Sequence, residues 1–92
     1  MMNYKKAGKI SKALADPNRL LILKEIKKQK GCLYCMALND IIDLAQPSIA
    51  HHLKLLTDTE LVTSSKEGRY VKYQINNEVL EDYIAFLEAF KK

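Results

Sequence analysis

The chain has two cysteines, Cys32 and Cys35, which lie three residues apart. Thiolates are soft ligands, suited to zinc, cadmium, lead, copper(I) or arsenic(III). The same Cys-x-x-Cys spacing also occurs in redox-active pairs. Two cysteines do not make the disulfide framework of a secreted protein. The pair therefore predicts one of three things: metal or metalloid binding, thiol redox chemistry, or a spacing that has no sensory role.

Each chemistry at this pair sets a geometric requirement. Two thiolates cannot fill a three-coordinate or four-coordinate site, so a metal at Cys32 and Cys35 needs another ligand from a second subunit, from water, or from an oxygen or nitrogen donor. For the redox alternative, residues three apart in a helical turn place their Cβ atoms about 5–6 Å apart. A local adjustment to roughly 4 Å would then allow a strained, readily reduced disulfide. Metal or metalloid binding is the first prediction and a redox switch is the second.

A second candidate for chemistry lies in residues 46–57. If this stretch is a helix, Ile49, Leu53 and Leu56 form one apolar stripe at offsets of four and three. Pro47 suits the first turn because its missing N–H costs nothing there. The opposite face carries polar side chains that can reach the edges of DNA bases, with one more at the N-terminal end: Ser48, His51, Lys54 and Gln46. His51 and His52 point about 100° apart on a helix, so they make a poor chelate, and we expect His52 to pack beside Leu53 and Leu56.

Length and charge limit the possible partners. Ninety-two residues, 48% of them apolar, make one small domain over residues 1–92 that would gain stability by oligomerising. Residues 1–30 carry nine Lys and Arg against Asp16 and Glu25, a net charge of +7, whereas residues 75–92 have a net charge of −2. A basic excess favours an anionic partner such as nucleic acid, although a lysine-rich solvated surface is the alternative. Because no apolar run approaches roughly 18 residues and no signal peptide is apparent, we expect a cytoplasmic protein with no membrane partner.

Hydrophobic periodicity predicts a mainly α fold with a small β-hairpin, in the order α-α-α-α-β-β-α. Asp16 and Pro17 begin the second helix as N-cap and first helical residue, and Asn76 or Asn77 caps the last helix. Gly68 lies where the hairpin turn needs a positive φ. Only residues near Ala45 separate the third and fourth helices, which is typical of a helix-turn-helix. The predicted helices are residues 5–15, 17–29, 34–44, 46–57 and 78–90, and the predicted strands are residues 61–65 and 70–75.

Several segments resemble the ArsR/SmtB family of winged-helix repressors. Residues 46–56, Gln-Pro-Ser-Ile-Ala-His-His-Leu-Lys-Leu-Leu, resemble the recognition helix of this family, residues 14–23 resemble an earlier helix and residues 68–73 resemble its wing. Ala45 and Ala50 stand where the family often has serines, so its DNA contacts do not transfer as a whole. The resemblance implies a regulator of transcription that forms a homodimer through its first and last helices. Repression is implied by the family, and the residues themselves do not exclude activation.

The resemblance also assigns DNA contacts to two elements. Side chains on the recognition helix read base edges, and basic residues of the wing contact phosphate or the minor groove. The helix contacts would be Gln46, Ser48, His51 and Lys54, and the wing contacts Lys66, Arg69 and Lys72. A two-fold dimer on double-stranded DNA predicts an inverted repeat with half-sites roughly 34 Å apart.

The family also places metal sites in two regions. Relatives cluster cysteines near the third helix, usually as Cys-x-Cys, a tighter spacing than that of Cys32 and Cys35. The family's other site uses His and Asp on the last helix. It is not supported here because His51 and His52 are the only histidines of the chain.

Two other classes of protein are less consistent with the sequence. A thioredoxin-like enzyme would place its cysteine pair after a strand in a βαβ unit, and the predicted order of elements is different. The sequence also has no paired nucleophile and base and no glycine-rich phosphate loop, so we predict no enzymatic activity. A pure protein-interaction module would not need the outward face of Ser48, His51 and Lys54. We therefore predict a homodimeric repressor that is released by a soft metal or metalloid at Cys32 and Cys35, or alternatively by their oxidation, or that has no cysteine sensor.

Overall fold

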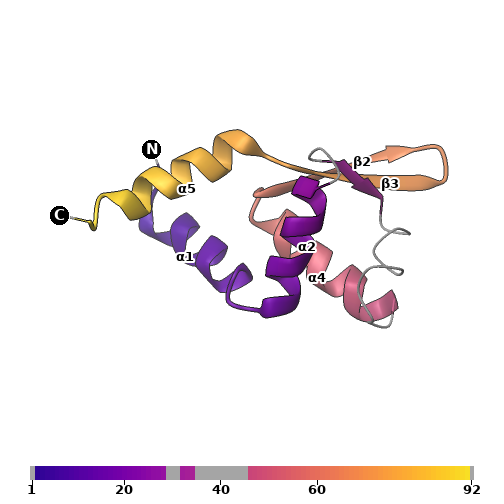
Figure 1. Cartoon of the computed structure of the whole chain (residues 1–92), viewed down its shortest axis with the longest axis horizontal. Coiled ribbons are helices and arrows are strands. Elements are labelled where there is room, and N and C mark those ends of the chain that lie inside the picture. The colour runs from indigo at the N-terminus through magenta and orange to yellow at the C-terminus, as the bar shows by residue number, and fades with distance from the viewer. Residues whose placement is uncertain (1, 29–31, 35–45, 92) are drawn as a thin grey trace.

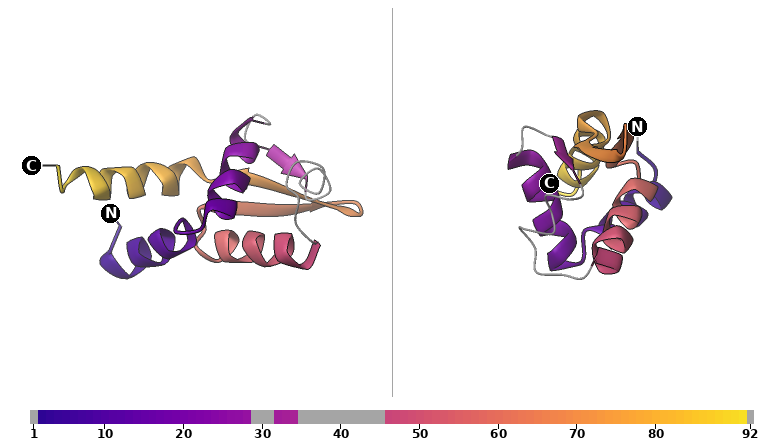
Figure 2. Two further views of the ribbon diagram at one scale, coloured as in Figure 1. Left: turned by 60° about the horizontal axis from the view of Figure 1, so that its bottom comes forward. Right: turned by 90° about the vertical axis from the view of Figure 1, so that its right-hand side faces the viewer.

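The computed structural model describes residues 2–28, 32–34 and 46–91 (Figure 1). The described elements follow in the order α1 (Tyr4–Ala13), α2 (Pro17–Lys28), β1 (Cys32–Tyr34), α4 (Gln46–Asp58), β2 (Val62–Glu67), β3 (Tyr70–Ile75) and α5 (Asn77–Glu88). The molecule is elongated, with extents of 44 × 23 × 21 Å. The helices α1 and α5 form one end together with both termini, and the tip of the β2–β3 hairpin and the start of α4 lie at the other end (Figures 1 and 2).

Capping side chains set where the first two helices begin. Asn3 caps α1, and its side-chain oxygen accepts a backbone hydrogen bond at 2.7 Å. Asp16 starts α2 as predicted, with Pro17 as the first helical residue, and its Oδ1 accepts from the N–H groups of Asn18 at 2.8 Å and Arg19 at 3.4 Å. The hydrogen bond from the Asn18 N–H, together with the backbone hydrogen bond and the positive charge of Arg19, holds the pKa of the Asp16 carboxyl below its usual range. Because this pKa is lower in the folded state, the cap stabilises the fold above about pH 3.9, the unfolded-state pKa, and the stabilisation is lost as the pH falls through the folded value.

The core consists of two adjoining clusters of apolar side chains. The first lies between α2, α4 and β2, and it includes the predicted stripe of Ile49, Leu53 and Leu56, each 1% exposed or less. The second lies between α1, α5 and the start of β2, and it is formed by Ala7, Ile10, Leu61 and Tyr83. Partly buried Leu14 and Leu23 pack against both clusters, so the two ends of the molecule share one interior.

Strand β3 is the centre of a three-stranded antiparallel sheet with the order β1-β3-β2. Residue Glu67 pairs with Tyr70, which leaves Gly68 and Arg69 as a two-residue hairpin loop. Gly68 has a φ of +62°, as predicted, and a positive φ at the first loop residue is the arrangement of a type II′ turn. The predicted hairpin is confirmed, with β3 at the predicted bounds and β2 shifted by one or two residues.

Strand β1 was not predicted, and it corrects the sequence analysis at two points. The third helix was expected to begin at Tyr34, which belongs to β1, while residues 35–44 lie outside the described residues. Cys32 also lies in this strand, in register with Gln74. The Cβ separation between Cys32 and Cys35 that was expected for a helical turn therefore does not apply. Cys35 itself lies outside the described residues. The strand forms because its backbone pairs with the second edge of β3. A segment of three residues has no local sequence pattern from which its pairing with the distant strand β3 could be predicted.

Helix α5 begins as predicted and carries apolar side chains on its outer surface. Asn76 caps the helix by accepting a hydrogen bond from the N–H of Val79 at 3.4 Å. Several large apolar side chains at this end of the molecule are exposed: Tyr4 81%, Ile84 46%, Leu87 45% and Phe90 69%. Within the described parts of the chain, no helix is long and apolar enough to cross a bilayer.

Candidate nucleic-acid interface

Helix α4 presents a polar face to solvent along one side of the molecule. Ser48, His51 and Lys54 are exposed on this face, and the sheet and α2 lie on its inner side (Figure 2). The first turn of α4, which begins at Gln46, lies at the same end as the hairpin tip. The side chain of Gln46 is outside the description. A helix of 13 residues is about 20 Å long and fits a major groove about 12 Å wide.

Lys54 is held on this face by a weak ion pair. Its Nζ lies 3.3 Å from Oδ2 of Asp58, and the two side chains are 72% and 51% exposed. An exposed pair four residues apart on a helix contributes only about 0.3–0.5 kcal/mol. Lys54 is therefore able to exchange this carboxylate for a phosphate or a base edge at little cost.

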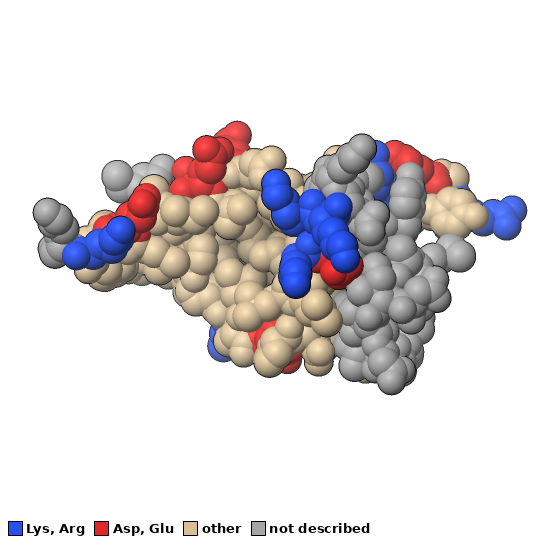
Figure 3. Space-filling model, viewed as in Figure 1, with Lys and Arg blue, Asp and Glu red and all other residues tan. Residues whose placement is uncertain are grey.

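The hairpin provides a second basic surface at the same end. Lys66 and Arg69 are exposed, and basic atoms mark the hairpin tip at the right of Figure 3. Lys72 differs from the other two predicted wing residues. Its side chain is 23% exposed and its Nζ lies 2.9 Å from Oε2 of Glu67, so a DNA contact by Lys72 would require this pair to open.

A network around Arg19 connects α1, α2 and α4. The guanidinium Nε donates to the carbonyl of Ala13 at 2.5 Å, Nη2 donates to the carbonyl of Lys12 at 3.5 Å, and Nη1 lies 3.9 Å from Oδ2 of Asp16. Nη1 also lies 3.1 Å from Nδ1 of His52, the neighbour of the outward His51. Because guanidinium only donates, His52 Nδ1 is the acceptor in this contact. Arg19 thus links the end of α1 to the helix that carries the polar face.

Sequence reasoning missed this network. It expected the half-buried His52 to pack beside Leu53 and Leu56 and gave Arg19 no role. The available signal was weak: Arg19 lies in the first turn of its helix, where the helix dipole disfavours a cation. Such a cation needs other partners, but their identity depends on tertiary structure.

At the opposite end of the molecule, the surface of α5 is apolar and acidic. The ring of Phe86 in α5 contacts Tyr4 at 5.6 Å and Phe90 at 5.5 Å between centroids. These rings line a hollow of about 850 Å³ together with Met2, Ala85 and Ala89. Tyr83 joins α5 to α1 through its hydroxyl, which lies 2.7 Å from Oγ of Ser11. Acidic side chains gather along α5, and uncharged surface separates them from the basic cluster over α2 (Figure 3).

Comparisons with known proteins decide the class of this fold. A family model described as a helix-turn-helix domain matches residues 14–65, which span α2 and α4 and reach into β2. An arsenical resistance operon repressor of Staphylococcus xylosus is 42% identical over 83 residues, which are 90% of this chain and 77% of that protein. The chain belongs to the ArsR family.

Two further relatives agree with this ArsR-family assignment. The transcriptional repressor SdpR of Bacillus subtilis is 31% identical over 81 residues, 88% of each chain. The solved structure of an ArsR-like transcriptional regulator from Rhodococcus sp. RHA1 matches with a TM-score of 0.83 at 27% identity, and the match covers 96% of this chain and 81% of that one. This ArsR-family protein is therefore a winged helix-turn-helix, DNA-binding regulator of transcription and not an enzyme, as the sequence predicted.

The predicted metal ligands are only partly described in this ArsR-family protein. Cys32 lies in β1, and nothing is described of its side chain or of Cys35. Among the residues that the structure describes, no group of three or more His, Cys, Asp and Glu side chains is arranged to hold a metal ion. The rings of His51 and His52 are 6.2 Å apart and tilted by 48°. Two thiolates are soft donors of the kind that soft metals and metalloids prefer, but a site at Cys32 and Cys35 still needs a further ligand.

Proposed function

We propose that this protein is a homodimeric repressor that binds an inverted-repeat operator and dissociates when Cys32 and Cys35 bind a soft metal ion or metalloid. The main support is the exposed face of Ser48, His51 and Lys54 on α4, next to a basic hairpin tip at the same end. The apolar surface of α1 and α5 at the other end supports a dimer. Two such subunits would present two recognition helices roughly one helical turn of DNA apart.

Within each half-site, the two basic elements have different tasks. Ser48 and His51 face the base edges, with Gln46 at the start of the helix, and they supply sequence discrimination, while Lys54 contacts a base edge or a neighbouring phosphate. Lys66 and Arg69 contact phosphate or the minor groove beside the hairpin, and Lys72 joins them when its pair with Glu67 opens. The phosphate contacts release counterions, so operator affinity should fall steeply with salt.

Replacing Lys54 or Arg69 with alanine tests these contacts. We expect each change to weaken operator binding about tenfold, and to flatten the slope of log affinity against log salt by about 0.9 per lost phosphate contact, or about 1.8 per dimer. The measurement is fluorescence anisotropy with a selected inverted repeat, titrated at several salt concentrations. Lys24→Ala, which removes the same charge from an exposed position in α2, is the control. Binding that matches this control in both variants would contradict the assignments.

The proposed inducer is a soft ion, with arsenic(III) as the first candidate. Similar proteins from Staphylococcus xylosus and Staphylococcus aureus are named arsenical resistance operon repressors. Two thiolates supply soft donors, and zinc, cadmium, lead and copper(I) are the other candidates. The third ligand would come from water, from a second subunit or from an oxygen or nitrogen donor. Because β1 pairs with β3, which forms the wing with β2, a change at Cys32 has a direct mechanical connection to the DNA-binding surface.

Replacing both cysteines with serine separates sensing from DNA binding. We expect the Cys32→Ser, Cys35→Ser variant to bind the operator like the unchanged protein, because neither residue belongs to the proposed DNA surface. The reduced protein on labelled operator is treated with arsenite, zinc, cadmium or a mild oxidant. Arsenite or a metal should release the unchanged protein and leave the variant bound. Release by oxidant that dithiothreitol reverses would favour the redox alternative, and equal release of both proteins would place the sensor elsewhere.

A further inference from the structure

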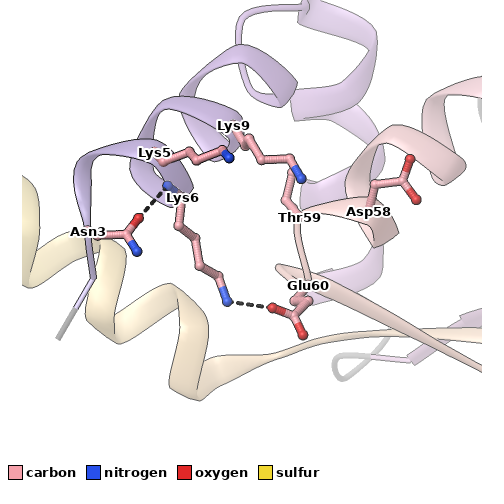
Figure 4. Close-up of a pocket in the computed structure, with 7 residues that line it drawn as sticks. All are labelled: Asn3, Lys5, Lys6, Lys9, Asp58, Thr59 and Glu60. Carbon is pink, nitrogen blue, oxygen red and sulfur yellow. Dashed lines mark hydrogen bonds and ion pairs between the residues drawn. The ribbon is translucent and has the colours of Figure 1, made fainter.

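Helix α1 carries a stripe of three exposed lysines that the proposed DNA contacts do not use. Lys5, Lys9 and Lys12 are spaced by four and three residues, opposite the buried side chains of α1. None of the three has an ion-pair partner among the residues that the structure describes. Their neighbour Lys6 does have one, because its Nζ lies 2.5 Å from Oε1 of Glu60 (Figure 4).

This lysine stripe is unfavourable for the helix itself. Like charges four residues apart repel each other on a helix surface, as Lys5 and Lys9 do here. A cation in the first turn also opposes the helix dipole, and the first turn of α1 has no acidic residue to balance Lys5. Local features that cost stability without compensation within the chain tend to mark functional surfaces. The stripe therefore favours an anionic partner outside the chain.

The stripe continues the outer surface of α4. Lys5 and Lys9 line a hollow of about 200 Å³ with Asp58, Thr59 and Glu60 at the end of that helix (Figure 4). Lys9 and Lys12 line a second hollow, of about 680 Å³, together with Leu55 and Asp58. The carboxylates of Asp58 and Glu60 are already paired with Lys54 and Lys6. Helices α1 and α4 follow one another along the same side of the molecule (Figure 2), so the basic surface passes from one to the other.

We propose that Lys5, Lys9 and Lys12 bind the phosphate backbone of the operator between its two half-sites. This inference rests on the proposed function. With α4 in the groove and α1 directed toward the partner subunit, the stripe lies over the DNA that separates the two recognition helices. Lys5 and Lys12 are about 10 Å apart along the helix, which matches about three base-pair steps at 3.4 Å each. These contacts add affinity and fix the register without reading sequence.

An extended polyanion suits the stripe better than a small free anion. The lysines are spread along a helix instead of converging on one point, and the carboxylates of Asp58 and Glu60 stand beside them. A compact anion at that place would meet these carboxylates at short range. A DNA backbone can run along the row of ammonium groups, on the side of the row that faces away from these carboxylates.

The double variant Lys9→Ala, Lys12→Ala tests this proposal. Each lost phosphate contact reduces the salt slope by about 0.9, so we expect the slope to fall by about 3.6 per dimer and operator affinity at low salt to fall more than tenfold. Lys27→Ala with Lys28→Ala is the matched control. It removes the same charge from the last turn of α2, away from α1 (Figure 1), and should leave the slope close to that of the unchanged protein. Circular dichroism should show that both variants are folded, because all four side chains are exposed.

Neutral DNA linkages identify the phosphates involved. Methylphosphonates placed between the half-sites should weaken the unchanged protein more than the Lys9→Ala, Lys12→Ala variant, in which only Lys5 still contacts these phosphates. A slope for this variant equal to that of the α2 control would overturn the proposal, as would equal weakening of both proteins by the neutral linkages. If the unchanged protein shows no salt-dependent operator binding at all, the proposed function itself fails. If the unchanged protein binds with the expected salt slope and the Lys9→Ala, Lys12→Ala variant has the same slope, only the proposal for the lysine stripe fails.

Discussion

Replacing Ile84 and Leu87 with aspartate should convert the dimer into a monomer and lower operator affinity by about 10²- to 10⁴-fold. The two side chains are 46% and 45% exposed on α5, so they contribute little to the interior of one subunit. In a dimer each aspartate would bury an unpaired charge in an apolar interface, which is strongly unfavourable. The monomer would then lose the gain in affinity that comes from binding two half-sites at once. Sedimentation at micromolar concentration and anisotropy with the full operator measure the two effects.

A matched change on another helix controls for general effects of charge. Leu20 and Leu21 are 49% and 37% exposed and belong to α2, not to α1 or α5. Their replacement by aspartate should leave a dimer that binds the full operator. A dimeric Ile84→Asp, Leu87→Asp variant, or an unchanged protein that sediments as a monomer, would contradict the proposed interface and the half-site geometry with it.

Replacing Arg19 with methionine should lower the free energy of unfolding by about 2–4 kcal/mol. The side chain is 13% exposed and donates hydrogen bonds to two carbonyls at the end of α1 and to His52. Hydrogen bonds from charged groups contribute about 1.5–3 kcal/mol each when they are shielded from solvent, and the carbonyls would lose their partner. Urea denaturation measures the change. Lys24→Met, which makes a similar substitution at an exposed position of the same helix, should have an effect near zero.

A double-mutant cycle separates the contact with α4 from the contacts with α1. Arg19→Met and His52→Leu are measured singly and together, and we expect a coupling energy of about 0.5–3 kcal/mol because the two side chains interact directly. The same variants should weaken operator binding, since both remove the connection that orients α4 relative to α1. Additive changes in stability would show that the histidine is not part of the network.

Local signals in the sequence were enough for most of the fold. Asp16 and Asn76 begin α2 and α5 because their side chains accept hydrogen bonds from the first helical N–H groups, and this capping needs no distant partner. Gly68 marks the hairpin turn for a similar local reason. The spacing of Ile49, Leu53 and Leu56 predicted both the helix and its buried face, and therefore also the exposed face that carries Ser48, His51 and Lys54. The general position of the candidate DNA surface followed from this pattern.

Two of the features that sequence reasoning missed depend on residues far apart in the chain. Strand β1 exists through its pairing with β3, and the contact of Arg19 with His52 depends on how α2 crosses α4. A third feature, the ion pair of Lys72 with Glu67, depends on the hairpin geometry, whereas the sequence analysis assigned Lys72 to DNA contact. Charge and residue type alone do not indicate which basic side chains already have a partner within the protein.

The central place of β3 has a thermodynamic consequence. This strand pairs with β1 at Cys32, forms the wing with β2, and leads through Asn76 into α5. If an inducer at β1 and the operator at the wing act on this one sheet, their binding free energies are coupled, and the coupling is reciprocal. An inducer that lowers operator affinity 100-fold would itself bind 100-fold more weakly to the operator-bound protein, a coupling of about 2.7 kcal/mol in either direction. Protein free in solution would then respond to lower concentrations of inducer than protein on its operator.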